Sequence, residues 1–184
     1  EVGVGVMPGW GGCKEMIRRH LGNKRAPRGP MPALVKAFEL IGTAQVAKSA
    51  MEAQRDFLII NEDDTITFNK ERVLFDAKQR ALGMVEGYQP PEEETFRLPG
   101  ATGRAAIDMA LHDFNMKGMA SDYDVHVGRE VAMVLTGGDT DVTEELTERD
   151  LLKLEQKHFV ALTKQPKTLA RLEHMLSTNK PLRN

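Results

Sequence analysis

A carboxylate at Glu1 stands ahead of a glycine-rich turn that opens a helix. The residues between them are Val-Gly-Val-Gly-Val-Met, and the turn itself reads Pro8-Gly-Trp-Gly-Gly12. Glycines before a helix N-terminus let backbone N–H groups approach a ligand closely, and the helix dipole favours negative charge there. The pattern therefore predicts either a site where a ligand meets the backbone or a tight turn that binds no ligand.

The apolar residues after the turn recur at helical spacing, so we predict that a helix begins near Gly11 or Gly12. Two phosphate-binding motifs are excluded here. The dinucleotide fingerprint G-x-G-x-x-G needs a third glycine where this chain has Pro8. The P-loop needs Gly-Lys-Ser/Thr, whereas Gly12 is followed by Cys13 and Lys14.

The stretch from Glu1 to Gly12, Glu-Val-Gly-Val-Gly-Val-Met-Pro-Gly-Trp-Gly-Gly, resembles the middle of the crotonase fold of the enoyl-CoA hydratase/isomerase family. In that family a Pro-Glu pair leads through x-x-G-x-x-P-G-x-G-G into a helix. Agreement in residue type and spacing over the whole stretch makes this signal far more specific than a lone glycine motif.

The resemblance implies a catalytic role for Glu1. In the hydratases that this stretch resembles, the glutamate at this position is one of two catalytic carboxylates that bracket a water molecule. It gives or takes a proton at the α-carbon side of the acyl thioester. The residues implied to bind that acyl-CoA substrate are those of the turn, Pro8, Gly9, Trp10, Gly11 and Gly12. The second carboxylate and the oxyanion-hole amides lie upstream in the family, so we expect the chain to begin inside a domain and to be inactive by itself.

Two later segments resemble the family more loosely. Ser49-Ala-Met-Glu-Ala53 is similar to its S-A-x-E-A segment, although Asp56-Phe-Leu-Ile59 stands where the family continues Gly-Leu-Val. Glu155 and Phe159 on a helix, a polar break and a basic tail at Lys180 are similar to its C-terminal helices, and Lys180 is taken as a further substrate contact. Such tails resemble those of multifunctional β-oxidation proteins, which join a hydratase domain to an NAD-dependent 3-hydroxyacyl-CoA dehydrogenase. We expect no cofactor in this chain and NAD in the dehydrogenase part of a larger parent.

Composition narrows the class of protein. The chain has 184 residues and is 41% hydrophobic and 28% charged, within the range of soluble globular proteins. A net charge of −2 gives no electrostatic footprint for nucleic acid or anionic membrane. One cysteine excludes an internal disulfide and fits a reducing compartment, so we expect a cytoplasmic protein. No apolar run approaches the ~20 residues of a membrane span.

Other residues that could do chemistry are isolated. No two of the five histidines have the spacing of a zinc motif, and Cys13 has no second soft ligand nearby, so we predict no metal site. Cys13 is expected to be a packed helix thiol and not a nucleophile.

The elements that must position these residues are predicted to be mainly helical, forming the C-terminal, helix-rich part of a crotonase-type α/β fold with appended helices. Short strands are expected at most near Val2–Val6, Phe57–Ile60 and Thr65–Phe68. Capped starts are expected near Asn69, Ser121 and Thr147, and the apolar faces of the helices are expected to point inward. The predicted divisions are 1–68 (crotonase-like portion), 69–87 (a helix), 88–100 (a linker) and 101–184 (a helical region).

Two hypotheses of different classes follow. The first is that the chain belongs to the hydratase part of a β-oxidation enzyme, with an acyl-CoA thioester and the rest of the parent chain as its partners. The second is a helical interaction or oligomerisation module, such as a homo-oligomer, with no chemistry of its own. Its support is the dominance of amphipathic helices in the pattern.

Overall fold

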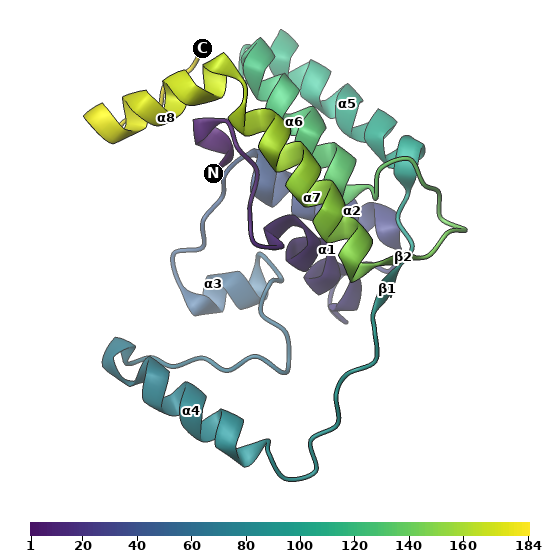
Figure 1. Ribbon diagram of the computed structural model, residues 1–184, viewed down its shortest axis with the longest axis vertical. Coiled ribbons are helices and arrows are strands. Elements are labelled where there is room, and N and C mark those ends of the chain that lie inside the picture. Colours follow the sequence, from purple (N-terminus) through teal and green to yellow (C-terminus); the bar gives the residue numbers. More distant parts are fainter.

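The computed structural model describes residues 1–184, and it is mainly helical, as predicted (Figure 1). Eight α-helices and two short 3-10 helices are joined by loops, and the one sheet has two strands. None of the helices combines the length and the apolar character that a membrane crossing requires. In chain order the elements are η1 (Val2–Val4), α1 (Gly12–Gly22), α2 (Pro30–Gly42), α3 (Ala50–Arg55), η2 (Lys70–Arg72), α4 (Val73–Gly83), β1 (Thr95–Phe96), α5 (Gly100–Met116), α6 (Asp122–Leu135), β2 (Leu146–Thr147), α7 (Glu148–Thr163) and α8 (Pro166–Thr178).

The three starts for which the sequence predicts a capping residue, at η2, α6 and α7, are confirmed. Ser121 at α6 and Thr147 at α7 each form a capping box, in which the side chain accepts an N–H at the third helical residue and that residue's Asp side chain accepts in return. Asn69 accepts the N–H of Glu71 at the start of η2. These local signals were sufficient to predict the helix starts, because each satisfies backbone donors that the helix itself leaves unpaired.

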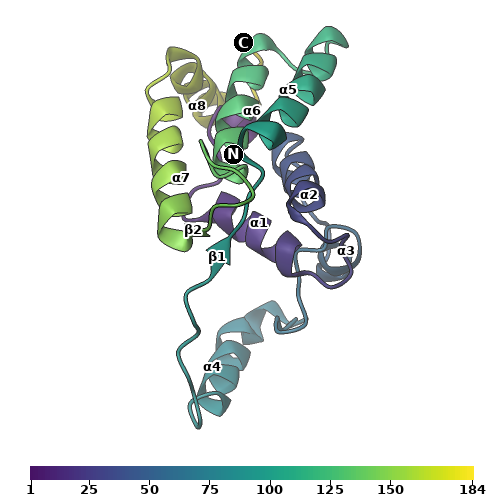
Figure 2. The same ribbon diagram turned by 90° about the vertical axis from the view of Figure 1, so that its right-hand side faces the viewer.

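Helix α6 lies at the centre of the core. It packs against α5, α7, α2 and α1, which surround it in both ribbon views (Figure 2). Its valines at 127, 131 and 134 are each no more than 1% exposed. Leu34 of α2 and Ile17 of α1 are buried in the same cluster. The sequence-distant ends of the chain are therefore held together by one apolar core.

The strands predicted near the N-terminus and in the middle of the chain are wrong. Residues 2–4 form the 3-10 helix η1, which Gly5 ends in a left-handed conformation (φ 85°). Residues 57–60 and 65–68 are irregular. The observed strands lie elsewhere, where Thr95 pairs with Thr147 and Phe96 with Leu146 in antiparallel register.

The middle segment stays irregular because side chains, and not a neighbouring strand, satisfy its backbone. The guanidinium of Arg19 donates to the carbonyl of Ile59 at 2.6 Å and also pairs with Asp64. The amide of Asn23 donates to the carbonyl of Leu58 at 2.9 Å. β-Branched residues favour extended backbone, but a strand also needs a partner to fill its hydrogen-bond ladder.

The expectation that the apolar faces of the helices point inward is wrong for α8. Leu169 and Leu176 are 54% and 88% exposed, whereas Thr168 and Arg171 are buried. The register of the helix is set by Arg171, which is 1% exposed and donates to Asp124 at 2.7 Å. A buried guanidinium needs such partners, so the ion pair overrides the leucine pattern.

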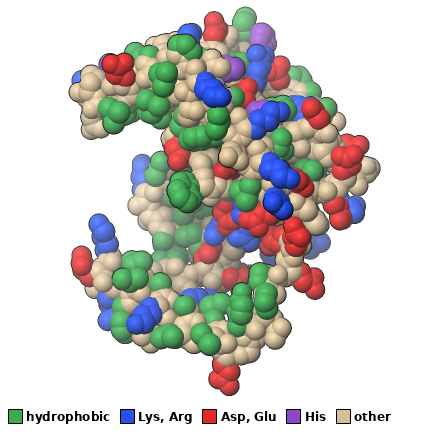
Figure 3. Space-filling view, in the orientation of Figure 1, with side chains coloured by type: hydrophobic (Ala, Val, Ile, Leu, Met, Phe, Trp, Pro, Cys, Tyr) green, Lys and Arg blue, Asp and Glu red, His purple; other side chains and the backbone are tan.

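Helix α4 stands apart from the core in Figures 1 and 2 and contains no buried residue. The expectation that apolar faces point inward fails here, since Leu74, Ala77 and Ala81 of α4, and Val85 just beyond its end, are exposed. The space-filling view shows apolar side chains over this part of the molecule, with the surface hollowed between α8 and α4 (Figure 3). An isolated helix of this length is marginal in water, so α4 lacks the packing that normally stabilises such an element.

Candidate functional site

The glycine-rich turn leads directly into α1, and its shape depends on small residues. Gly11 is the N-cap of α1 with φ 78°, a left-handed conformation that side chains rarely adopt. A Cβ at Gly12 would lie 2.7 Å from the Cβ of Pro8, closer than real Cβ contacts allow. Trp10 lies between two glycines, also has a positive φ (58°), and its side chain is fully exposed.

The N-terminus of α1 carries no cap from its own sequence, and a residue of α7 supplies one. Glu155 is 4% exposed, and one carboxylate oxygen accepts the N–H of Gly11 at 2.6 Å. Its second oxygen accepts the N–H of Cys13 at 3.0 Å and that of Lys14 at 3.5 Å. The positive end of the helix dipole and these amides compensate the buried carboxylate.

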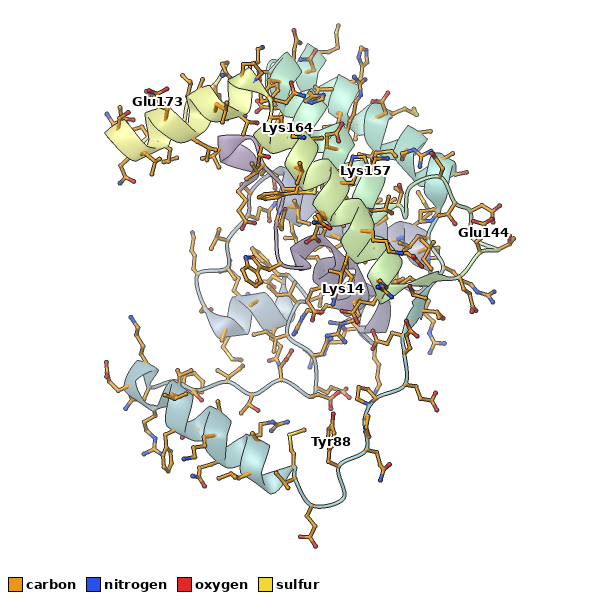
Figure 4. All side chains as sticks on the ribbon, in the orientation of Figure 1. Lys14, Tyr88, Glu144, Lys157, Lys164 and Glu173 are labelled. Atoms are coloured by element: carbon orange, nitrogen blue, oxygen red, sulfur yellow. The ribbon has the colours of Figure 1, made fainter.

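Neighbouring residues of α7 also meet the turn. The ammonium of Lys14 pairs with Glu148 at 2.7 Å, at the place where α1 meets the start of α7 (Figure 4). Cβ atoms built at Gly11 and Gly9 would lie 3.2 Å from Leu152 and 3.6 Å from Phe159. One face of α7 therefore lines the turn along its length.

Glu1 lies exposed at the N-cap of η1, and its carboxylate makes no hydrogen bond or ion pair. Its charge nevertheless acts on the first turn of α1. The pKa of the Cys13 thiol is raised well above its usual value, chiefly by burial and further by the charges of Glu155 and Glu1. The structure thus brings Glu1 into the electrostatic neighbourhood of the turn.

Lys180 lies beyond the end of α8 and is exposed. Its backbone N–H donates to the hydroxyl of Thr178 at 3.2 Å, and its side chain makes no hydrogen bond or ion pair. No hydrogen bond or ion pair joins it to the turn, so no such interaction links the two parts of the chain that are predicted to bind the substrate.

Glu155 received no site role from the sequence, although a signal for it exists. The apolar stripe of α7 runs through Leu151, Phe159 and Leu162, and Glu155 falls on that stripe, one turn after Leu151. A glutamate on a buried face needs a compensating partner, which the amides of α1 provide.

The histidines do not form a metal site, and no group of three or more His, Cys, Asp and Glu side chains is placed to hold a metal ion. His158 bonds through Nδ1 to Glu130 at 2.6 Å. His20 is 1% exposed with neither ring nitrogen paired, and burial, aided by the charge of Lys36, lowers its pKa to about 4. It is therefore a neutral core residue at neutral pH.

The burial and raised pKa of Cys13 predict an unreactive thiol. With the folded chain, a disulfide reagent such as Ellman's should react at least about a hundredfold more slowly than in urea, because opening this part of the core costs on the order of 3 kcal/mol. A Cys13→Ala/Ser177→Cys variant, whose thiol would be on the exposed face of α8, is the matched control. A native Cys13 that reacts as fast as that control would contradict the buried placement.

Comparison with known proteins gives one informative match. The chain is 40% identical over 185 aligned residues to a protein of Bacillus subtilis (strain 168) named probable 3-hydroxyacyl-CoA dehydrogenase. The alignment takes in the whole of this chain and 23% of that protein. No protein-family model matches the chain, and no solved structure matches it. The chain is therefore homologous to part of a probable 3-hydroxyacyl-CoA dehydrogenase and spans about a quarter of its length.

Proposed function

We propose that this chain belongs to the enoyl-CoA hydratase part of a larger fatty-acid β-oxidation enzyme that also carries a 3-hydroxyacyl-CoA dehydrogenase. The observation that carries the proposal is the stretch from Glu1 to Gly12, whose residues resemble the catalytic centre of the crotonase family. The relative's name supports it, because hydration of an enoyl-CoA yields a 3-hydroxyacyl-CoA, the compound that the relative is named for oxidising.

The proposed chemistry assigns one proton transfer to Glu1. Water adds across the carbon–carbon double bond of a trans-2-enoyl-CoA, so that hydroxide joins C3 and a proton joins C2. Glu1, in its protonated form, would deliver the proton to C2, while the second carboxylate that the resemblance implies elsewhere in the larger protein would take the proton that water loses. In the reverse direction the two groups would exchange roles. Its carboxylate is free for this work, since no hydrogen bond or ion pair occupies it.

The turn residues Pro8, Gly9, Trp10, Gly11 and Gly12 would shape the wall beside the thioester, and Lys180 would contact the substrate. The amides of Gly11 and Cys13 are already held by Glu155. The turn would therefore act through its shape and through exposed Trp10, and not as an anion-binding helix N-terminus.

NAD would serve the dehydrogenase, and the residues of this chain do not fit it. Residues Val2–Val4 form a 3-10 helix, and residues 6–8 are irregular, where a dinucleotide site needs a strand. Gly5 packs tightly instead, since a Cβ there would lie 2.8 Å from the hydroxyl of Thr168. NAD is therefore proposed for another part of the larger protein, and a cytoplasmic location is proposed with it.

Because the chain spans 23% of its relative, the test uses a full-length protein that contains it. That protein should hydrate crotonyl-CoA and oxidise 3-hydroxybutyryl-CoA with NAD. The Glu1→Gln variant should lose about 10²–10⁴ in kcat for hydration, the contribution typical of a general acid or base, and keep its dehydrogenase rate.

The matched control is Glu173→Gln, which removes an exposed carboxylate of α8 that has no partner (Figure 4). Both rates should be unchanged in it. Unchanged hydration in Glu1→Gln, or a full-length protein without hydratase activity, would reject the assignment.

A second candidate function is a helical interaction module, and the exposure of α4 favours it. Leu74 and Leu82 of α4, and Val85 just beyond its end, are 82%, 56% and 68% exposed, so this segment offers an apolar face without a partner in the chain. The partner would be the rest of the larger protein or a second copy of this chain.

Light scattering after size-exclusion chromatography tests whether the chain self-associates through α4. Self-association through α4 should give a mass that rises with concentration, and Leu74→Glu/Leu82→Glu should return the chain to a monomer with its helical circular dichroism intact. Gln79→Glu, on the same helix, adds a charge at an exposed polar position and should leave association unchanged. A monomer at every concentration would count against self-association.

A further inference from the structure

Helix α1 cannot cap its own N-terminus. The N-cap is Gly11, which has no side chain, and its positive φ excludes most alternatives. Gly12 cannot carry a side chain because of Pro8. A helix start that is buried without a cap leaves backbone donors unpaired at a cost in stability, so this turn needs an acceptor from elsewhere.

The acceptor is Glu155, which lies 144 residues from Gly11 in the sequence. Its two oxygens hold the N–H groups of Gly11, Cys13 and Lys14, so the carboxylate spans the junction between the turn and the first turn of the helix. Two oxygens on a single planar group fix an orientation as well as a position. These hydrogen bonds therefore fix the position of the turn against α7.

Packing against the same face of α7 also holds the turn in position. Leu152 lies against Gly11 and Phe159 against Gly9, on either side of Glu155. The one side chain of the turn that points away from this face is that of Trp10, which is fully exposed. The backbone from Gly9 to Lys14 is thus fixed on one side and open on the other.

We propose that Glu155 is a positioning residue for hydration, a role that rests on the proposed function. It holds the Pro8–Gly12 turn in place relative to Glu1 without touching the substrate. Its carboxylate holds the turn by accepting the N–H groups of Gly11 and Cys13, which are then no longer free to bind an anion. Since misplacing a reacting group by about 1 Å can cost on the order of 10² in rate, loosening the turn acts on kcat more than on KM.

The test compares three substitutions in the full-length protein. Glu155→Gln keeps the shape but turns an N–H₂ group toward backbone donors, and should lower kcat for crotonyl-CoA hydration by about 10–100-fold with KM within about threefold. Glu155→Ala should lose at least as much. Glu155→Asp keeps the charge and should recover part of the rate. Lys157→Gln, an exposed change on the same helix, should leave hydration at the wild-type rate (Figure 4).

A purely structural role makes a different prediction, namely a parallel loss of hydration and dehydrogenation as the protein unfolds. The positioning role predicts that dehydrogenation stays at the wild-type rate while kcat for hydration falls. A wild-type protein that hydrates crotonyl-CoA, with Glu155→Gln at the same kcat, would overturn the inference.

A second measurement is independent of activity. Trp10 is the one tryptophan of the 184 residues, so its fluorescence anisotropy reports on the turn in this chain. Glu155→Gln should lower the anisotropy while the far-ultraviolet circular dichroism stays unchanged, and Lys157→Gln should alter neither. If the full-length protein does not hydrate crotonyl-CoA, the proposed function fails. An unchanged anisotropy in Glu155→Gln would instead refute the inference that Glu155 holds the turn in position.

Discussion

The carboxylate of Glu155 is the interaction on which the candidate site depends. It links the first helix of the chain to the seventh through the amides of Gly11 and Cys13, at 2.6 and 3.0 Å. A charged acceptor at a helix N-terminus makes stronger hydrogen bonds than a neutral one, and burial increases their strength further. Without it, the glycines that give the turn its shape would leave a helix start with unpaired donors in the protein interior.

Other features of the site follow from that link. The turn fits closely against α7, which buries Cys13 and leaves Trp10 as the outward side chain of the turn. The carboxylate of Glu155 fills the position at the N-terminus of α1 where an anion could otherwise bind, so a ligand would have to meet the exposed face of the turn. The valine-rich centre of α6 packs against both α1 and α7. Arg171 of α8 joins that helix to α6 through its hydrogen bond to Asp124. Structure near the site is therefore held by two buried charges, each with partners of its own.

How much of this the sequence could predict depends on how local each signal is. The helix starts at Ser121 and Thr147 were predictable, because a capping box is complete within a few residues. The strand expected at residues 2–6 was not predictable, because a strand depends on a partner and the one sheet of the structure pairs only β1 with β2. The exposure of Leu169 and Leu176 in α8 was not predicted, because the long-range ion pair between Arg171 and Asp124 decides which face of the helix turns inward. Glu155 could have been found from its place on an apolar stripe, but its partners lie too far away in sequence to be named.

The most direct test of the account is amide hydrogen exchange in the 184-residue chain, measured by nuclear magnetic resonance. Gly11 lies at the N-cap of α1 and Cys13 within its first turn, where backbone N–H groups lack intrahelical partners and normally exchange early. If Glu155 holds them, both amides should be protected to the same level as those of Val131 in the centre of α6, and Glu155→Gln should remove that protection. Exchange of Gly11 and Cys13 at the rate of an unstructured peptide would contradict the account.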